Sequence, residues 1–277
     1  MSAQKFRIRK SHGGYERFSQ KKLYSSLKRS GLSHQQSQII AKKVSAEIGE
    51  GTKTKDIFRK TLQLVKRDSP SAAVHYSLKR AILDLGPTGH HFETYVGKYF
   101  QEIGYTTTTR ESFQGRLVRH EVDVVAVKDK KRYFVECKFH NRVGIKNDVK
   151  ITLYIKARWD DLRQGNEGKN LQGYYLATNT AYTQDALTYA NGTGLKLLGV
   201  NAPESETFLQ SIQKLKLYPI TCLKKLTKII LNQLLSRDIV LAKEIPQNVK
   251  LLQRLGMTED AINAVVAEVQ RLEEFHL

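Results

Sequence analysis

Residues 120–140 read HEVDVVAVKDKKRYFVECKFH. Two runs rich in Val and aromatic residues, 120–127 and 133–140, flank a polar turn, and this composition favours β-strands. If the turn centres on Asp129 and Lys130, facing residues have numbers that sum to 259. The sequence therefore predicts an antiparallel hairpin near the middle of the chain, with a register that the turn sets.

Two carboxylates share one face of this predicted hairpin. Asp123 faces Glu136, with Cβ atoms about 4.5–5.5 Å apart. Lys138 projects beside Glu136, because side chains alternate along a strand. Two carboxylates in a largely apolar hairpin repel each other unless a cation or a proton neutralises them. Their oxygens, with a backbone carbonyl such as that of Cys137, suit Mg²⁺ or Mn²⁺. The alternative interpretation is a surface hairpin with an ordinary Lys–Glu ion pair.

The chain is strongly basic, with a net charge of +19 over 277 residues. Residues 1–86 hold 19 basic and 6 acidic residues, residues 87–200 hold 17 and 12, and residues 201–277 hold 10 and 9. Such a balance predicts a polyanionic partner, either nucleic acid or an anionic membrane surface. A basic surface that is merely solvated is the alternative. The N-terminal third is the main electropositive segment, and the middle third keeps enough acidic groups to hold a cation.

The remaining bulk properties exclude several classes of protein. Two cysteines, Cys137 and Cys222, are too few for a disulfide framework or a zinc site. The opening MSAQKFRIRK lacks the apolar core of a signal peptide. The most apolar stretch, 220–242, contains too many charges to span a bilayer. We therefore expect a soluble, cytoplasmic protein.

Turn signals and changes of periodicity divide the chain into three segments, 1–86, 88–202 and 203–277, with the first boundary at Gly86-Pro87. The expected fold is multidomain α/β: a small α+β domain, a central mixed α/β sheet flanked by helices, and an all-α C-terminal domain. We expect helices over 19–30, 33–49, 70–84, 89–103, 147–165, 181–193, 205–216, 220–234, 238–243, 246–254 and 258–275, a helix from 54 onwards, and strands over 105–109, 117–127, 132–139, 173–178 and 196–200.

The carboxylate pattern resembles that of a known nuclease class. Asp123, followed thirteen residues later by Glu136-Cys137-Lys138, is similar to the D-x(n)-E-x-K core of PD-(D/E)XK nucleases. The wider context, over about 88–200, resembles the Mrr-type restriction endonuclease domain. Its landmarks occur in order: Phe92-Glu93 on the opening helix, Gly104-Tyr105, the two motif strands, LATNTAYTQDAL at 176–187 and the strand LKLLGV at 195–200.

This resemblance implies a metal-dependent DNA endonuclease. Asp123, Glu136 and the carbonyl of Cys137 would hold Mg²⁺ or Mn²⁺ against the scissile phosphate. Lys138 would assist the attacking water, and hydrolysis would leave a 5′-phosphate. Glu93 would contact the metal or its water shell, with a solvated helix glutamate as the alternative. The sequence departs from many Mrr-like proteins, which have Gln at the position of Glu136, whereas Glu is ordinary in the wider class.

Residues 5–86 resemble an ATP-cone, a small regulatory nucleotide-binding domain. The resemblance rests on RKSHGGYERFSQKKL at 9–23, GTKTKDIF at 51–58 and AAVHYSLKRAIL at 72–83. Several lysines at a glycine turn and at a helix start also form an anion site on physical grounds.

The ATP-cone resemblance implies a site for ATP or dATP. Lys10 and Lys22 would bind phosphates, Glu16 would lie near the base or sugar, and Thr54 would sit by the base. The Ser11-His12 pair replaces the usual Arg-Asp of the turn, which removes one phosphate-binding cation. A preference for another nucleotide, or a role in DNA binding or oligomerisation, are the alternatives for this domain.

The C-terminal segment resembles helix-hairpin-helix DNA-binding units only loosely, at LLQRLGMTEDAINAVVAEVQRL over 251–272, and oligomerisation is an equal alternative. Together the segments predict a nucleotide-regulated DNA endonuclease of prokaryotic restriction or defence, acting as a homodimer or larger oligomer because cutting two strands needs two active sites. The alternatives are a nucleotide-sensing DNA-binding regulator without cleavage and a structure-specific DNA repair nuclease.

Overall fold

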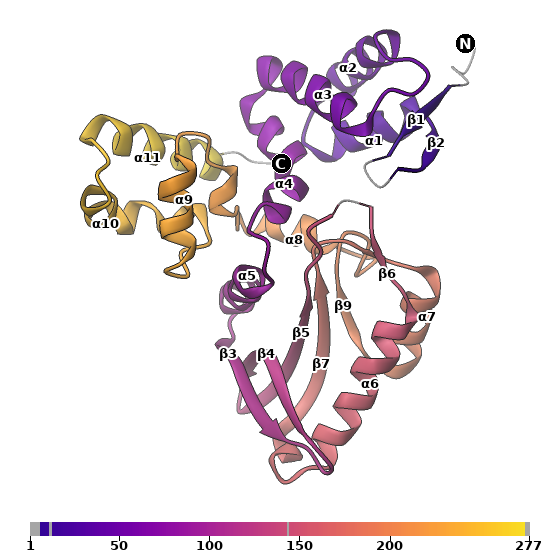
Figure 1. Cartoon of the computed structure of the whole chain (residues 1–277), viewed down its shortest axis with the longest axis vertical. Helices are drawn as coiled ribbons and strands as arrows, with labels where there is room; N and C mark the ends of the chain where they lie inside the picture. Colours follow the sequence, from indigo (N-terminus) through magenta and orange to yellow (C-terminus); the bar gives the residue numbers. More distant parts are fainter. Residues whose placement is uncertain (1–5, 11–12, 143, 275–277) are drawn as a thin grey trace.

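The computed structural model describes residues 6–10, 13–142 and 144–274. In these ranges the elements enclose an N-terminal apolar core and one core on each face of a central sheet. Figure 1 shows the N-terminal helices at one end, the sheet at the other and the C-terminal helices to one side. None of the helices within the described ranges combines the length and the apolar composition that crossing a membrane requires.

An N-terminal bundle forms first along the chain, and serine caps define the starts of its first two helices. The hydroxyl of Ser19 accepts a hydrogen bond from the Lys22 N–H (3.2 Å), and Ser33 forms a reciprocal capping box with Gln36. These caps satisfy backbone N–H groups that a helix start leaves without partners. The elements are β1 (Arg7–Arg9), β2 (Tyr15–Arg17), α1 (Gln20–Arg29), α2 (His34–Ala46) and α3 (Thr54–Asp68).

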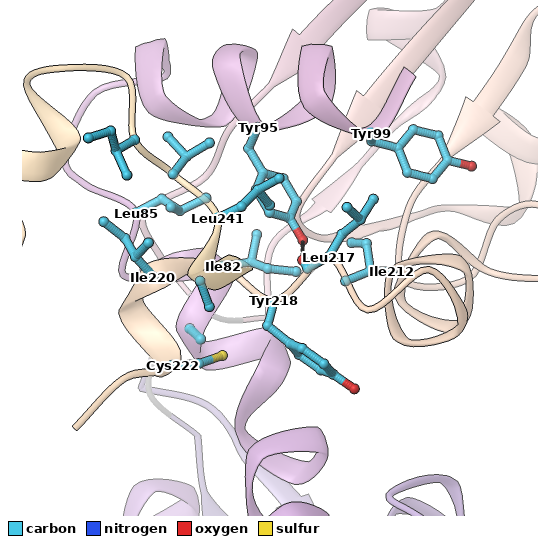
Figure 2. Packing of buried hydrophobic residues seen from close by; sticks show 14 of the residues in the cluster. Ile82, Leu85, Tyr95, Tyr99, Ile212, Leu217, Tyr218, Ile220, Cys222 and Leu241 are labelled. Atoms are coloured by element: carbon cyan, nitrogen blue, oxygen red, sulfur yellow. Dashed lines mark hydrogen bonds between the residues drawn. The ribbon is translucent and has the colours of Figure 1, made fainter. Parts of the chain in front are cut away.

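The fourth helix, α4 (Pro70–Leu83), belongs to two cores. Ala72 and Ala73 near its start pack in the N-terminal core, whereas Leu78 and Ile82 pack in the larger core that reaches the C-terminal helices. Figure 2 shows Ile82 among the labelled residues of this larger core, which also come from α5 and the C-terminal segment. The helix therefore joins the N-terminal bundle to the rest of the molecule through packed side chains.

The central sheet has the strand order β3-β4-β5-β7-β9. Its first three strands are antiparallel, and β7 and β9 extend it in parallel, so the sheet is mixed as expected. Helix α5 packs on one face, and α6 and α7 pack on the other (Figure 1). The elements are α5 (His90–Glu102), β3 (Thr106–Gln114), β4 (Arg119–Lys128), β5 (Lys131–Lys138), α6 (Val149–Gln164), η1 (Asn166–Asn170), β7 (Leu171–Thr178), α7 (Gln184–Thr193) and β9 (Lys196–Leu198).

The predicted hairpin register is confirmed. Strands β4 and β5 pair from Lys128↔Lys131 to Val124↔Val135, and each pair of numbers sums to 259. The turn residues Asp129 and Lys130 both have positive φ, 52° and 63°, as a two-residue hairpin turn of type I′ requires.

Two predicted boundaries in the sheet domain are wrong. The helix expected over 181–193 begins only at Gln184, because β8 (Ala181–Tyr182) pairs in parallel with β6 (Lys146–Asn147) as a separate two-stranded ribbon. The strand expected over 105–109 continues to Gln114, since it pairs with β4 along most of its length. The local sequence pattern indicates neither the short pairing of β6 with β8 nor the length of β3, because both depend on contacts with another segment.

The C-terminal segment is less continuously helical than predicted. The helix expected over 220–234 is wrong in its first half, because the Ile220 N–H donates to the Val240 carbonyl (2.9 Å) and Pro219 bridges Leu241. This tertiary pairing overrides the helical periodicity. The elements are α8 (Phe208–Lys214), η2 (Ile220–Cys222), α9 (Lys228–Leu235), η3 (Ala242–Glu244), η4 (Pro246–Asn248), α10 (Val249–Arg254) and α11 (Glu259–Glu273).

Candidate active site

A local kink in two strands positions Asp123. The pairing of β3 with β4 includes Thr109↔Val124 and Glu111↔Val122 but skips Arg110 and Asp123 between them. Arg110 has a φ of 58°, an unusual value for a residue with a Cβ. At the same point the pairing of β4 with β5 ends, so Asp123 leaves both ladders.

The side chain of Asp123 takes the place of the backbone hydrogen bond to β5 that this position lacks. Its Oδ2 accepts a hydrogen bond from the backbone N–H of Cys137 (2.6 Å). This contact holds Asp123 next to the strand that carries Glu136, as the predicted register requires. The predicted Cys137 ligand therefore lies beside both carboxylates, with its N–H on Asp123 and its side chain packed against the apolar core on the α5 face.

Three carboxylates influence one another electrostatically. Burial, then the negative charge of Glu136, raises the pKa of Asp123 to about 7, and the charge of Glu93 acts in the same direction. Burial also raises the pKa of Glu136, with a further increase from Glu93. Glu93 lies in the first turn of α5, and its side chain is only 12% exposed. Glu93 therefore lies near enough to act on the pair through its charge, while its own carboxylate pairs with Arg110 (3.4 Å) and is not freely solvated.

Arg158 of α6 contacts Glu136 of the carboxylate pair and was missed by the sequence analysis. Its guanidinium forms an ion pair with Glu136 Oε2 and donates to the backbone carbonyl of Glu121. This positive charge lowers the pKa of Glu136 against the larger effect of burial. The sequence of α6, VKITLYIKARWDDLRQ, contains several basic residues, and no local signal distinguishes Arg158 from the others.

Asp123 and Glu136 each keep one carboxylate oxygen to which the described residues donate no hydrogen bond. Within the described residues, Asp123 accepts a hydrogen bond through Oδ2 and Glu136 through Oε2, and no donor is found for Asp123 Oδ1 or Glu136 Oε1. Two such oxygens on neighbouring hard ligands suit Mg²⁺ or Mn²⁺. In the described part of the chain, however, no group of three or more His, Cys, Asp or Glu side chains is arranged to hold a metal. A cation here would depend on two carboxylates, a backbone carbonyl, water and substrate.

Lys138 ends β5 with an exposed side chain next to this pair. Its positive charge lowers the pKa of Glu136. The Lys138 carbonyl accepts a hydrogen bond from the Thr178 hydroxyl (2.7 Å), and Asn147 donates to the same hydroxyl (3.0 Å). Thr178 and Asn147 are buried, so a fixed polar network holds the strand end that presents the lysine.

Three of the four predicted nucleotide residues of the N-terminal bundle meet, and Thr54 lies apart from them. Lys10 and Lys22 both pair with Glu16, and their hydrogen bonds lower the pKa of this carboxyl to about 2. Thr54 starts α3 on the other side of β1, where its hydroxyl donates to the Arg9 carbonyl (3.1 Å). Ser11 and His12, the departure from the ATP-cone pattern, lie outside the described residues.

A cavity of about 290 Å³ opens between these elements, and we call it the cradle. Lys10 and Thr54 line it, whereas Glu16 and Lys22 are not among its lining residues. The sequence analysis missed three of its cations, although Lys53 and Lys55 flank Thr54 in the motif GTKTKDIF. The cradle is lined by Arg9, Lys10, Gly13, Lys53, Thr54 and Lys55.

Comparison with known proteins identifies the two later segments. The Mrr-type restriction endonuclease family model matches residues 86–202, and the model for the C-terminal region of AF1548-like proteins matches residues 218–273. Neither range includes residues 1–85, so the ATP-cone resemblance of that segment stays a prediction.

Similar proteins match about two thirds of this chain and nearly all of their own length. An uncharacterized protein of Archaeoglobus fulgidus is 31% identical over 178 residues, which are 64% of this chain and 99% of that protein. The crystal structure of AF1548, a protein of unknown function, is 30% identical with a TM-score of 0.56, over 67% of this chain and 98% of that one. Can2 from Sulfobacillus thermosulfidooxidans is 15% identical with a TM-score of 0.33, over 71% of this chain and 53% of that one, too low to carry an argument. The chain therefore belongs to the same family as the Archaeoglobus fulgidus protein, with a restriction endonuclease domain over 86–202 and an AF1548-like C-terminal domain over 218–273.

Proposed function

We propose that this protein is a divalent-metal-dependent DNA endonuclease. The observation that carries the proposal is the pairing of two part-buried carboxylates, Asp123 and Glu136, beside the exposed Lys138 in a restriction endonuclease domain. The raised pKa values of both carboxyls indicate that they lack a full complement of positive charge, since Arg158 contacts Glu136 alone. A bound Mg²⁺ or Mn²⁺ would supply that charge and polarise the scissile phosphate.

The residues of the chain have separate roles in this proposal. Asp123 and Glu136 would hold a bound cation, and the Cys137 N–H fixes the orientation of Asp123. Lys138 holds a proton at Nζ next to the scissile phosphate, where it orients the attacking water and stabilises negative charge that develops in the transition state. Glu93 would contact the water shell of a bound cation from α5.

Cleavage of supercoiled plasmid in Mg²⁺ or Mn²⁺ tests the proposal. We expect nicked or linear product from the wild type and none from Lys138→Ala. Lys131→Ala is the matched control, because Lys131 is an exposed lysine at the opposite end of the same strand. Equal cleavage by the two variants would exclude the role of Lys138. No cleavage by the wild type of methylated, unmethylated or branched DNA, with DNA still bound in a gel shift, would favour a DNA-binding regulator instead. Cleavage of branched DNA alone would favour a repair nuclease.

We also propose that the cradle binds ATP or dATP and that binding biases the nuclease. The cradle supports this because four cationic side chains and the N-terminus of α3 surround a cavity large enough for phosphate groups. A regulatory ligand needs different affinities for two states of the protein. Plasmid cleavage with and without each nucleotide tests the coupling, and rates that no nucleotide changes, at concentrations that saturate binding, would reject it.

Cleavage of both strands requires two active sites, so we propose a homodimer as the active form. Linear product that accumulates without a nicked intermediate, together with light scattering at the mass of two chains, is the expected result. A monomer that only nicks the plasmid would exclude the dimer.

A further inference from the structure

A large cavity lies between the N-terminal bundle and the nuclease domain. Its volume is about 810 Å³, within the range of roughly 300–1,000 Å³ that pockets for drug-sized ligands occupy. One wall consists of α1, the start of α3 and α4. The other consists of the loops that follow β5, β7 and β9, together with α8. The cavity is separate from the carboxylate pair, since Asp123 and Glu136 do not line it.

The lining of this interdomain cavity is strongly basic. Five cationic side chains line it, against the single acidic residue Glu204. Arg80 pairs with Asp84, but within the described residues the other four form no salt bridge. Uncompensated cations that face one cavity attract an anionic ligand. The cationic residues are Arg29, Lys55, Lys79, Arg80 and Arg142.

Lys79 is the most informative of these cations. It is half-buried on α4, and burial lowers the pKa of its ammonium group. A lysine that loses solvent without gaining an acidic partner destabilises the fold, unless an anionic ligand compensates its charge. Its position in the wall of a roomy cavity leaves space for that anion.

The cavity also offers a stacking surface. Phe58 and Tyr76 both line it, with their rings stacked at a centroid distance of 5.3 Å and an interplanar angle of 12°. Aromatic faces beside cations bind the bases of single-stranded nucleic acid, because every base has a π-face.

The cavity lies close to the proposed cleavage position. Arg142 follows Lys138 by four residues, so their Cα atoms are at most about 15 Å apart. About four nucleotides of a B-form strand cover that distance. Asn179 links the loop after β7 to the loop after β5 within one wall, since its side chain accepts from the His140 N–H (2.9 Å) and donates to the His140 carbonyl (2.8 Å).

We propose that the interdomain cavity binds a single-stranded segment of the DNA substrate next to the cleavage site. Phosphates contact Arg29 and Lys79 from the N-terminal bundle and Arg142 from the nuclease domain, and a base stacks on Phe58 or Tyr76. This inference rests on the proposed nuclease function, because it assigns the strand in the cavity to the substrate. It gives the N-terminal bundle a direct part in holding DNA, in addition to any nucleotide in the cradle.

Fluorescence anisotropy of a labelled twelve-nucleotide oligo-dT with the full chain, in EDTA, tests the inference without cleavage. We expect Arg29→Ala and Arg142→Ala each to weaken binding about tenfold, as loss of a charged hydrogen-bonding group does. Each should also reduce the slope of log affinity against log salt by about 0.7. Arg67→Ala is the matched control, because Arg67 is an exposed arginine of the same bundle outside the cavity, and its affinity should equal the wild type.

Equal affinities of all three arginine variants would overturn the inference. So would loss of mononucleotide binding in Arg29→Ala with oligo-dT binding unchanged, since the cavity would then hold a free nucleotide. The two proposals are separable, because Lys138→Ala should abolish cutting, whereas Arg29→Ala and Arg142→Ala should weaken oligo-dT binding in the absence of any metal. If no DNA is cut but the arginine variants still lose oligo-dT binding, the nuclease proposal fails and the strand site remains supported.

Discussion

Two carboxylates in different regions of the molecule have opposite electrostatic surroundings. Glu16 in the N-terminal bundle lies between Lys10 and Lys22, whose hydrogen bonds lower its pKa to about 2. Asp123 in the sheet is part-buried beside Glu136, and its pKa rises to about 7. In the bundle two lysines share one carboxylate, whereas within the described residues no cationic side chain forms an ion pair with Asp123. This contrast is the reason that we propose an anion site in the bundle and a cation site in the sheet.

Removing the charge of Asp123 should give the largest effect. Asp123→Asn keeps an acceptor for the Cys137 N–H but removes a proposed metal ligand, so cleavage should fall by more than the roughly 10–100-fold that loss of an outer-shell group costs. The same variant should unfold at a higher temperature in EDTA, because repulsion from Glu136 disappears. Asp129→Asn, in the exposed turn, is the control that should leave cleavage unchanged. Full cleavage by Asp123→Asn would remove the carboxylate pair from the mechanism.

The two carboxylates should also give opposite pH dependences of stability in EDTA. The folded pKa of Asp123 is raised from 3.8 to about 7, so its contribution to the free energy of unfolding falls as pH rises between these values. The folded pKa of Glu16 is lowered from 4.5 to about 2, so its contribution is present above 4.5 and lost as pH falls toward 2. Urea unfolding of the wild type, Asp123→Asn and Glu16→Gln across pH 2–8 measures both contributions. If the free energy of unfolding depended on pH in the same way in all three proteins, the opposite pKa shifts of the two carboxyls would be contradicted.

The positive charge of Arg158 partly neutralises Glu136 in the sheet. Arg158→Met removes the partner of Glu136, whose side chain is 22% exposed, and should lower the free energy of unfolding in EDTA by about 1–3 kcal/mol, less than for a fully buried pair. Glu136→Gln in the same chain should restore most of the loss. A double-mutant cycle by urea unfolding measures the coupling, and additive effects would show that the pair contributes nothing.

The smallest effect is expected in the cradle. Lys10→Ala removes one of four cations that line it and should weaken ATP or dATP binding about tenfold, as loss of one charged hydrogen bond does. Lys28→Ala, on an exposed face of α1 outside the cradle, should bind like the wild type. Titration calorimetry on the full chain gives both affinities. Equal affinities of the two variants would show that Lys10 does not contribute to nucleotide binding.

The sequence predicted the parts of the site that depend on strand periodicity. Asp123, Glu136 and Lys138 meet because a two-residue turn fixes the register of the hairpin, and both features are local. Glu93 was placed near them by the Mrr resemblance, and its 12% exposure agrees with that position.

The missed residues depend on contacts between distant segments. Arg110 adopts positive φ where β3 and β4 kink, and its neighbours in the sequence do not require that conformation. Arg158 reaches Glu136 only because α6 packs across the sheet. The helix expected over 220–234 failed for the same reason, since Ile220 pairs with Val240, twenty residues further along the chain.

The two-core helix α4 has a consequence for synthesis on the ribosome. The hydroxyl of Thr221 donates to the carbonyl of Ala81, 140 residues earlier in the chain. Protein synthesis adds about 5–20 residues per second, so the segment that covers Leu78 and Ile82 is made roughly 7–28 s after them. During that interval the nascent chain exposes an apolar helix face after the N-terminal bundle is complete. The newly made protein is therefore a candidate client for chaperones until its last quarter has emerged.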